Sequence, residues 1–223
     1  MVKSKSFDGR ERSVRQSKGE MSFEALADRL AIREAVENWA LWRDTGRWEK
    51  LRSLYTADGI MHTTWFVGSA DEFIARCKEA ARKGGRSQHF MGAASIEVNG
   101  ERAIAETRLQ LLVRGMLQSV EVDITCHARS YDRFAREGQA WRIKERILIY
   151  EKDRLDPLDP AATVKLDAAE LARYPAGYRH LACLQASGGA RITPGLPTPG
   201  SEALERLYRK GNQWLHSDKA QTP

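Results

Sequence analysis

The sequence is poor in cysteine, and its few cysteines lack the spacing that metal sites or disulfide frameworks need. Cys77, Cys126 and Cys183 are the three present, an odd number without any Cys-x-x-Cys pair. The five histidines are scattered and no His-Glu-x-x-His motif occurs. We therefore expect no metal site, and we predict a reduced, cytoplasmic setting.

Long apolar runs and glycine-rich phosphate loops are also missing. No apolar stretch approaches the length of a membrane span, and no apolar segment near the start is typical of a secretory signal. No nucleotide-binding fingerprint occurs either. The sequence thus predicts a protein that needs no membrane and no cofactor.

The positive charge is modest and partly local. The chain carries a formal net charge of +6, and residues 1–20 hold six Lys/Arg against three Asp/Glu. Because that segment has almost no apolar residues, we predict a disordered basic arm. Elsewhere acids and bases alternate, as in EKDRLD at 151–156, which favours a solvated surface over nucleic-acid binding. Only the arm supports a nucleic-acid interpretation, so we expect no such partner.

The apolar patterns predict an α+β fold. Helical periodicity covers 22–44, 48–55 and 69–85, and 59–66 has the pattern of a strand. Four longer strand patterns follow at 89–98, 101–113, 119–134 and 140–153. Asn99-Gly100, Arg114-Gly115 and Glu137-Gly138 are predicted turns between them. This order favours helices packed on one face of a curved antiparallel sheet.

We accordingly predict one domain over 21–156 with extensions on either side. Pro157 and Pro160 end the last strand pattern. Residues 157–223 contain a tyrosine-rich stretch, a Gly/Pro loop and a final helix pattern over 201–216. We expect this C-terminal extension to pack on the domain or on a neighbouring subunit.

The first helix pattern ends in a carboxylate on its apolar face. Val36, Ala40 and Asp44 share that face. A buried carboxylate at a helix C-terminus is disfavoured by burial and by the helix dipole, so it needs a donor opposite it. A histidine would meet that need and gain basicity. Spacing alone does not choose among the histidines, although His89 begins an apolar strand after a polar loop; solvent exposure of Asp44 is the alternative.

Strand alternation and composition suggest further pocket residues. If Arg146 points inward, Leu148 and Tyr150 do as well. The alternative for Arg146 is a salt bridge with a neighbouring acid such as Asp123. On the preceding strand, Asp123, Thr125 and His127 share one face, and Val122, Ile124 and Cys126 share the other. Apolar or aromatic walls are predicted from Trp39, Tyr55, Met61, Thr63, Trp65 and Phe90, with ordinary core packing as the alternative for each. Together they favour a large aromatic or polycyclic substrate.

Four segments resemble one known family. They are LADRLAIREAVENWALWRDTGRW (26–48), LYTADG (54–59), SQHF (87–90) and WRIKER (141–146). The combination, over roughly 22–153, is similar to the SnoaL-like branch of the NTF2-like superfamily. The resemblance implies a cone-shaped half-barrel with three N-terminal helices packed on a bent antiparallel sheet. Within that branch the chain looks most like cofactor-free eliminating enzymes: scytalone dehydratase, bile-acid 7α-dehydratase, hexachlorocyclohexane dehydrochlorinase and diarylpropane lyases.

The resemblance implies roles for individual residues. Asp44 and His89 match the catalytic Asp–His pair, and Arg146, five residues after Trp141, matches the arginine that assists the leaving group. Alignment with the dehydrochlorinase places Asp123, Thr125 and His127 inside the cone. Trp39 stands where the dehydratases have a tyrosine, which disfavours plain dehydration.

The relatives are mostly homotrimers, with some dimers, so we expect a homo-oligomer.

These observations predict a cofactor-independent lyase. His89 would remove a proton from an aromatic or polycyclic small molecule, which then loses formaldehyde, water or halide. A lignin-derived diaryl compound fits this description. The alternatives are an isomerase or cyclase of the same fold and a non-catalytic module that binds a small ligand.

Overall fold

The computed structural model describes residues 22–217. Its first part contains three helices, α1 (Phe23–Asp44), α2 (Trp48–Ser53) and α3 (Ala70–Arg82). Ser22 caps α1 through its side chain, and Ser69 and Glu72 form a reciprocal capping box at α3. The predicted basic arm, residues 1–20, lies outside the described residues.

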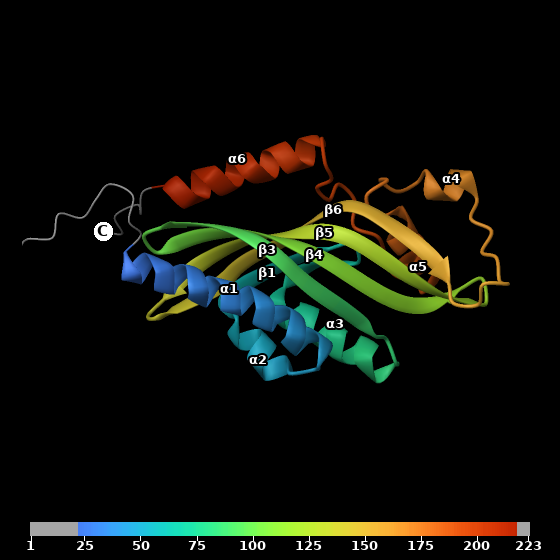
Figure 1. Ribbon diagram of the computed structural model, residues 1–223, viewed down its shortest axis with the longest axis horizontal. Coiled ribbons are helices and arrows are strands. Elements are labelled where there is room, and N and C mark those ends of the chain that lie inside the picture. Colours follow the sequence, from blue (N-terminus) through green and yellow to red (C-terminus); the bar gives the residue numbers. More distant parts are fainter. Residues whose placement is uncertain (1–21, 218–223) are drawn as a thin grey trace, which may run out of the picture.

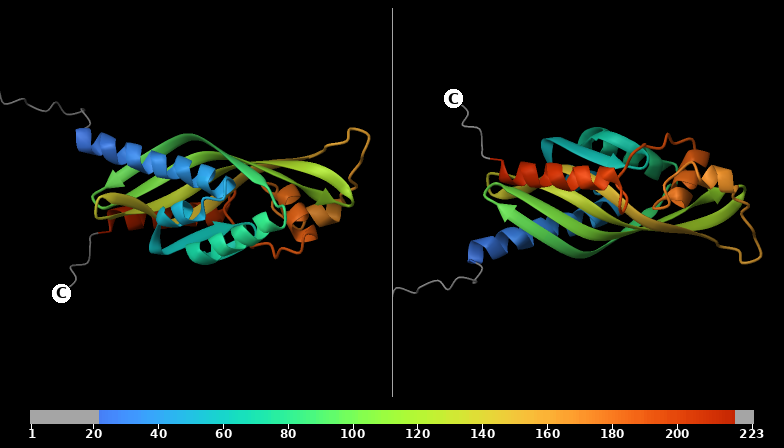
Figure 2. Two further views of the ribbon diagram at one scale, coloured as in Figure 1. Left: turned by 90° about the horizontal axis from the view of Figure 1, so that it is seen from below. Right: turned by 90° about the horizontal axis from the view of Figure 1, so that it is seen from above.

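A single six-stranded sheet runs the length of the molecule (Figure 1). Its strands lie in the order β2-β1-β6-β5-β4-β3. β1 and β6 are parallel and the other neighbours antiparallel. The bounds are β1 (Tyr55–Thr63), β2 (Phe66–Ser69), β3 (Ser87–Asn99), β4 (Arg102–Leu117), β5 (Val120–Glu137) and β6 (Ala140–Pro157). The sheet is strongly curved, and α1–α3 lie on its concave side (Figures 1 and 2), which confirms the α+β half-barrel.

Two details of the strands differ from the sequence prediction. The turn predicted at Arg114-Gly115 is wrong, because β4 continues to Leu117. The chain reverses at Gln118 and Ser119 instead, where both residues have positive φ, the backbone that a tight hairpin needs. The segment predicted as one strand, 59–66, is split between β1 and β2.

The C-terminal extension covers both faces of the sheet (Figure 1). It forms α4 (Ala168–Leu171), α5 (Arg179–Ser187) and α6 (Glu202–His216). Leu181, fully buried in α5, belongs to the main core on the concave side. Leu207 of α6 packs with Tyr131 and Ile149 in a separate cluster on the convex side. Each face of the sheet is therefore partly covered by this extension.

The helices of the described part include none that is long and apolar enough to cross a membrane. Cys77, Cys126 and Cys183 are all buried and free.

Candidate active site

The last residue of α1 holds the first part of β3 through two hydrogen bonds. Asp44 Oδ2 accepts the backbone N–H of His89 at 2.6 Å, and Oδ1 lies 2.7 Å from His89 Nδ1. Gly46, with φ of 70°, turns the chain directly after α1, so the helix can end with its apolar face, and Asp44, toward the sheet. The carboxylate at the end of the apolar stripe thus has two N–H partners.

The surroundings of His89 favour the neutral form of its imidazole. Burial lowers the pKa of His89 below its ordinary value, and nearby Arg43 and Arg146 lower it further, while the hydrogen bond to Asp44 opposes them. A neutral ring that donates from Nδ1 to Asp44 carries its lone pair on Nε2. Nε2 has no hydrogen-bond partner among residues 22–217. His89 is therefore arranged as a proton acceptor.

Arg43 brings a positive charge to the same carboxylate. Arg43 Nη1 lies 3.4 Å from Asp44 Oδ1 and also donates to the hydroxyl of Ser87. The side chains of Arg43 and Asp44 are 18% and 16% exposed, so their charges are weakly screened. Asp44 is shared between an arginine and a histidine.

Trp39 of α1 contacts two of the three sequence-predicted catalytic residues, His89 and Arg146. Its ring meets that of His89 edge-on at 5.3 Å between centroids, and the guanidinium of Arg146 lies 4.2 Å from its centroid. Its indole N–H donates to the hydroxyl of Tyr55 at 2.7 Å. The structure therefore places Arg146 and His89 against the same aromatic ring.

Arg146 is fully buried and forms a bidentate ion pair with Asp132. Nε and Nη2 donate to the two carboxylate oxygens at 2.6 and 2.7 Å, and the side chains are 1% and 0% exposed. Ser130 adds a hydrogen bond to Asp132 at 3.2 Å. Within the described residues the remaining nitrogen, Nη1, is buried without a partner. One donor of Arg146 is therefore unused inside the cone.

The salt bridge predicted as the alternative for Arg146 is present, but its partner is Asp132 and not Asp123, the acid named as an example. Asp123 pairs with Arg114 at 2.8 Å. Asp132 was missed by the sequence analysis, although it lies directly opposite Arg146 in the β5–β6 register. The sequence feature that could have identified Asp132 is strand alternation. Asp132 and Ser130 have even numbers, so they lie on the same face of β5 as the apolar residues Val122, Ile124 and Cys126.

The prediction that Asp123, Thr125 and His127 point into the cone is also wrong. The even-numbered residues of β5 are the buried ones: Val122, Ile124 and Cys126 are all 0% exposed. A one-residue error in the assumed register moves every side chain to the other face. The three polar residues lie half-buried on the convex side.

Most of the predicted walls are buried on the concave side. They are Trp39, Tyr55, Met61, Thr63, Leu148 and Tyr150, with Trp65 half-buried against the same core. Phe90 is the exception: it is 56% exposed, because its neighbour His89 points inward and alternation sends Phe90 outward. The prediction that Phe90 lines this site is wrong.

The extension reaches this side of the sheet as well. The hydroxyl of Tyr150 accepts the backbone N–H of Thr64, and its ring packs on Tyr178 at 5.0 Å between centroids. Thr64 also donates to Gln185 of α5 at 2.6 Å. The part of the concave face beside Tyr150 is therefore covered by the extension.

No metal cluster is present in the described part: residues 22–217 contain no group of three or more His, Cys, Asp or Glu side chains placed to hold an ion.

The chain is similar to known proteins over most of its length. A PEP2-like protein of Fusarium vanettenii is 30% identical over 87% of this chain and 88% of its own, and pea pathogenicity protein 2 of the same fungus is 28% identical over 86% and 87%. A protein of Novosphingobium aromaticivorans, provisionally described as a scytalone dehydratase, shares the fold with a TM-score of 0.50, 15% identity and coverage of 63% of this chain and 97% of its own. The model of the SnoaL-like domain matches residues 24–147. The chain therefore belongs to the SnoaL-like family of the NTF2-like superfamily.

Proposed function

We propose that this protein is a cofactor-independent lyase that eliminates a small group from an aromatic or polycyclic molecule. The observation that carries the proposal is that Asp44 binds both the backbone N–H and the ring Nδ1 of His89. These two hydrogen bonds orient the ring and leave Nε2 without a partner among the described residues. A positioned base of this kind typically contributes ~10²–10⁴-fold to a rate. Membership of the SnoaL-like family and the likeness of fold to a protein described as a dehydratase support an enzyme that processes small molecules.

The reaction can be written with these residues. His89 Nε2 takes a proton from a substrate carbon, the C–H electrons form a C=C bond, and the neighbouring bond to hydroxide or halide breaks. Asp44 stabilises the imidazolium that results. Arg146 Nη1 donates to the departing oxygen or halide. In loss of water, the imidazolium returns its proton to the leaving hydroxyl.

Loss of formaldehyde uses the same groups differently. His89 takes the hydroxyl proton of a hydroxymethyl group, and formaldehyde leaves as the C–C bond breaks. The electron pair of that bond forms a C=C bond, and the adjacent hydroxyl leaves as water with the proton that His89 had taken. Trp39, at the position of the dehydratase tyrosine, has already given its N–H to Tyr55. The aromatic walls around it favour an aromatic substrate, and a lignin-derived diaryl compound is the one we would test first.

The test is incubation with hydroxylated and diaryl aromatic compounds in D₂O without added metal or cofactor, followed by mass spectrometry. We expect loss of water, halide or formaldehyde, abolished in His89→Ala and retained in His127→Ala, whose histidine lies on the convex face. Deuterium incorporation without net loss would instead identify an isomerase. Binding without turnover, unchanged in an Asp44→Asn/His89→Ala double variant, would identify a ligand-binding module.

The assembly and setting of the enzyme are part of the same proposal. We propose a cytoplasmic homo-oligomer, a trimer or a dimer, on the family resemblance. Sedimentation equilibrium checks the assembly, and a single species of monomer mass would contradict it.

A further inference from the structure

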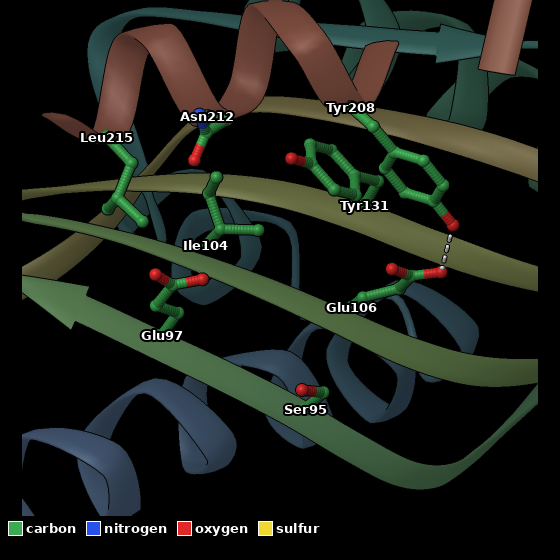
Figure 3. A pocket seen from close by; sticks show the side chains of 8 residues that line it. All are labelled: Ser95, Glu97, Ile104, Glu106, Tyr131, Tyr208, Asn212 and Leu215. Carbon is green, nitrogen blue, oxygen red and sulfur yellow. Dashed lines mark hydrogen bonds between the residues drawn. The ribbon is translucent and has the colours of Figure 1, made fainter. Parts of the chain in front are cut away.

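One part of the convex face is covered tightly by α6, and a neighbouring part is not. Under the helix, a Cβ on Gly211 would lie 1.9 Å from the hydroxyl of Tyr131, and Tyr208 donates a hydrogen bond to Glu106 at 2.9 Å (Figure 3). A cavity of about 370 Å³ lies on the part that α6 leaves uncovered, and its lining comes from the sheet alone. This volume lies at the small end of the range of ~300–1,000 Å³ that is typical of small-molecule sites.

The cavity crosses four neighbouring strands. Its aromatic, charged and glycine lining residues are Phe90 and Gly92 of β3, Arg108 and Gln110 of β4, His127 of β5, and Glu151 and Lys152 of β6. Four of these are successive partners in the strand register and form one row across the sheet: Phe90, Gln110, His127 and Lys152. The register shifts beside this row, between Met91 and Ala94 and between His127 and Ala128. Such irregularities bend strands locally, so a hollow is expected at this place in the sheet.

Phe90 gives the cavity an uncovered aromatic wall. Its side chain is 56% exposed although it is large and apolar. Gly92 follows on the same face, and a Cβ there would approach Cβ of Arg108 to 3.4 Å, so a side chain at this position would fill space beside Arg108. Phe90 and His127, which the sequence predicted as pocket residues of the cone, line this cavity instead.

The charge around the cavity is positive. Arg108 and Lys152 both line it and are exposed. Glu151 is the one carboxylate in the lining; it binds Arg129 at 2.7 Å and lies 3.7 Å from Arg108, which is too far for a hydrogen bond. Within residues 22–217, Lys152 and His127 form neither a hydrogen bond nor an ion pair. The cations of the cavity therefore have donors that no carboxylate of the described chain uses.

We propose that this cavity binds a small aromatic carboxylate of one or two rings. The ring packs against Phe90, and the carboxylate accepts hydrogen bonds from Arg108 and Lys152. An inorganic anion would leave the exposed ring uncovered, and an uncharged aromatic molecule would leave the cations unpaired. The cavity lies on the opposite face of the sheet from His89, so its occupation does not depend on the proposed lyase reaction.

The probe is 2-naphthoate, titrated into the full chain and followed by ¹H–¹⁵N NMR, with 2-naphthalenemethanol as the uncharged control and acetate as the control without a ring. We expect saturable shifts at Phe90, Gln110 and His127 with naphthoate alone, and weaker binding at higher salt. Lys152→Met should weaken binding about threefold to fivefold, as expected when an exposed charge pair is lost. Phe90→Leu should weaken it about threefold, because the contact between two rings is lost.

Lys144→Met is the matched control, because Lys144 lies on the same strand outside the cavity and pairs with Asp58. It should leave the affinity unchanged. Equal binding of the alcohol or of acetate, equal loss in Lys144→Met and Lys152→Met, or no saturable shift in the millimolar range would each overturn the proposal. Shifts confined to α1 and His89 would place the ligand in the cone and would overturn it as well. Because Phe90 and Lys152 are both exposed, their variants should keep native spectra, which separates loss of the site from loss of the fold.

Discussion

At the scale of single residues, burial and nearby arginines favour the neutral form of His89. Burial and Arg43 lower the pKa of His89 below the ordinary value of 6.5. The proposed activity should therefore rise with pH through a midpoint below 6.5 and be flat at neutral pH. Because the folded pKa lies below the unfolded one, stability should fall as pH drops through 6.5 and level off below the folded pKa.

Arg43→Met should raise the pKa of His89 and move the activity midpoint to higher pH, because a neighbouring positive charge is removed. An NMR titration of the His89 ring reads this directly, without substrate. Arg33→Met removes an exposed arginine of the same helix that pairs only with Glu37 in the described structure, and should leave the pKa unchanged. An unmoved His89 titration in Arg43→Met would show that Arg43 has no electrostatic role.

Variants of the buried pair of Arg146 and Asp132 test its contribution to stability separately from its proposed role in catalysis. Arg146→Met leaves the Asp132 carboxylate buried and unpaired, so it should cost about 3–5 kcal/mol in free energy of unfolding. Adding Asp132→Leu should restore most of that loss, since no buried charge remains. Urea denaturation measures both variants.

Activity should behave differently in the same pair of variants. The double variant should fold and yet remain inactive, because Nη1 of Arg146 is the group proposed to meet the leaving atom. An active, stable double variant would limit Arg146 to a structural role.

At the scale of elements, Gly211 determines how closely α6 lies on the sheet. Alanine in the middle of an exposed helix ordinarily stabilises it by up to ~1 kcal/mol relative to glycine. Here the added Cβ would meet Tyr131, so Gly211→Ala should instead destabilise the protein by about 1–3 kcal/mol. Thermal denaturation checks the sign. Gly211→Ala combined with Tyr131→Leu should recover part of the loss, and a stabilising single variant would show that α6 shifts freely.

The sequence predicts the elements well because their signals are local. Serine caps and the 3.6-residue period locate α1 and α3 to within a residue or so at their starts. The end of β4 was missed because Gly115 is a turn residue by composition, whereas its absent side chain leaves room for Leu184 of α5, which a Cβ would approach to 3.1 Å. That requirement comes from a helix about 70 residues later in the chain.

The candidate site was predictable only in part. Asp44 and His89 lie together as the family motif implied, because the ends of α1 and β3 are fixed by the fold. Which face of β5 points inward was not predicted, because Asp123, Thr125 and His127 form one alternating set of polar residues and Ser130 and Asp132 belong to the other. The burial of Val122, Ile124 and Cys126 and the pairing of Asp132 with Arg146 show which set is inside.

At the scale of the whole molecule, the C-terminal extension shares the main core with the family domain. The SnoaL-like match ends at residue 147, yet Leu181 is fully buried in the same cluster as Trp39 and Tyr55. Asp153 of β6 also binds the start of α5, accepting the N–H of Leu181 and contacting His180 Nδ1, each at 2.8 Å. We therefore expect the two regions to unfold as one cooperative unit.

Leu181→Ala tests this expectation, because it removes buried contacts from the extension alone. It should lower the free energy of unfolding of the whole chain by about 2–5 kcal/mol, with coincident urea transitions by far- and near-ultraviolet circular dichroism. Leu158→Ala, which truncates a leucine of the extension that is 37% exposed, is the matched control and should cost far less. Two separated transitions in Leu181→Ala would mean that α5 detaches while the sheet stays folded. In that case the part of the concave face beside Tyr150 would be uncovered while the family domain stays folded.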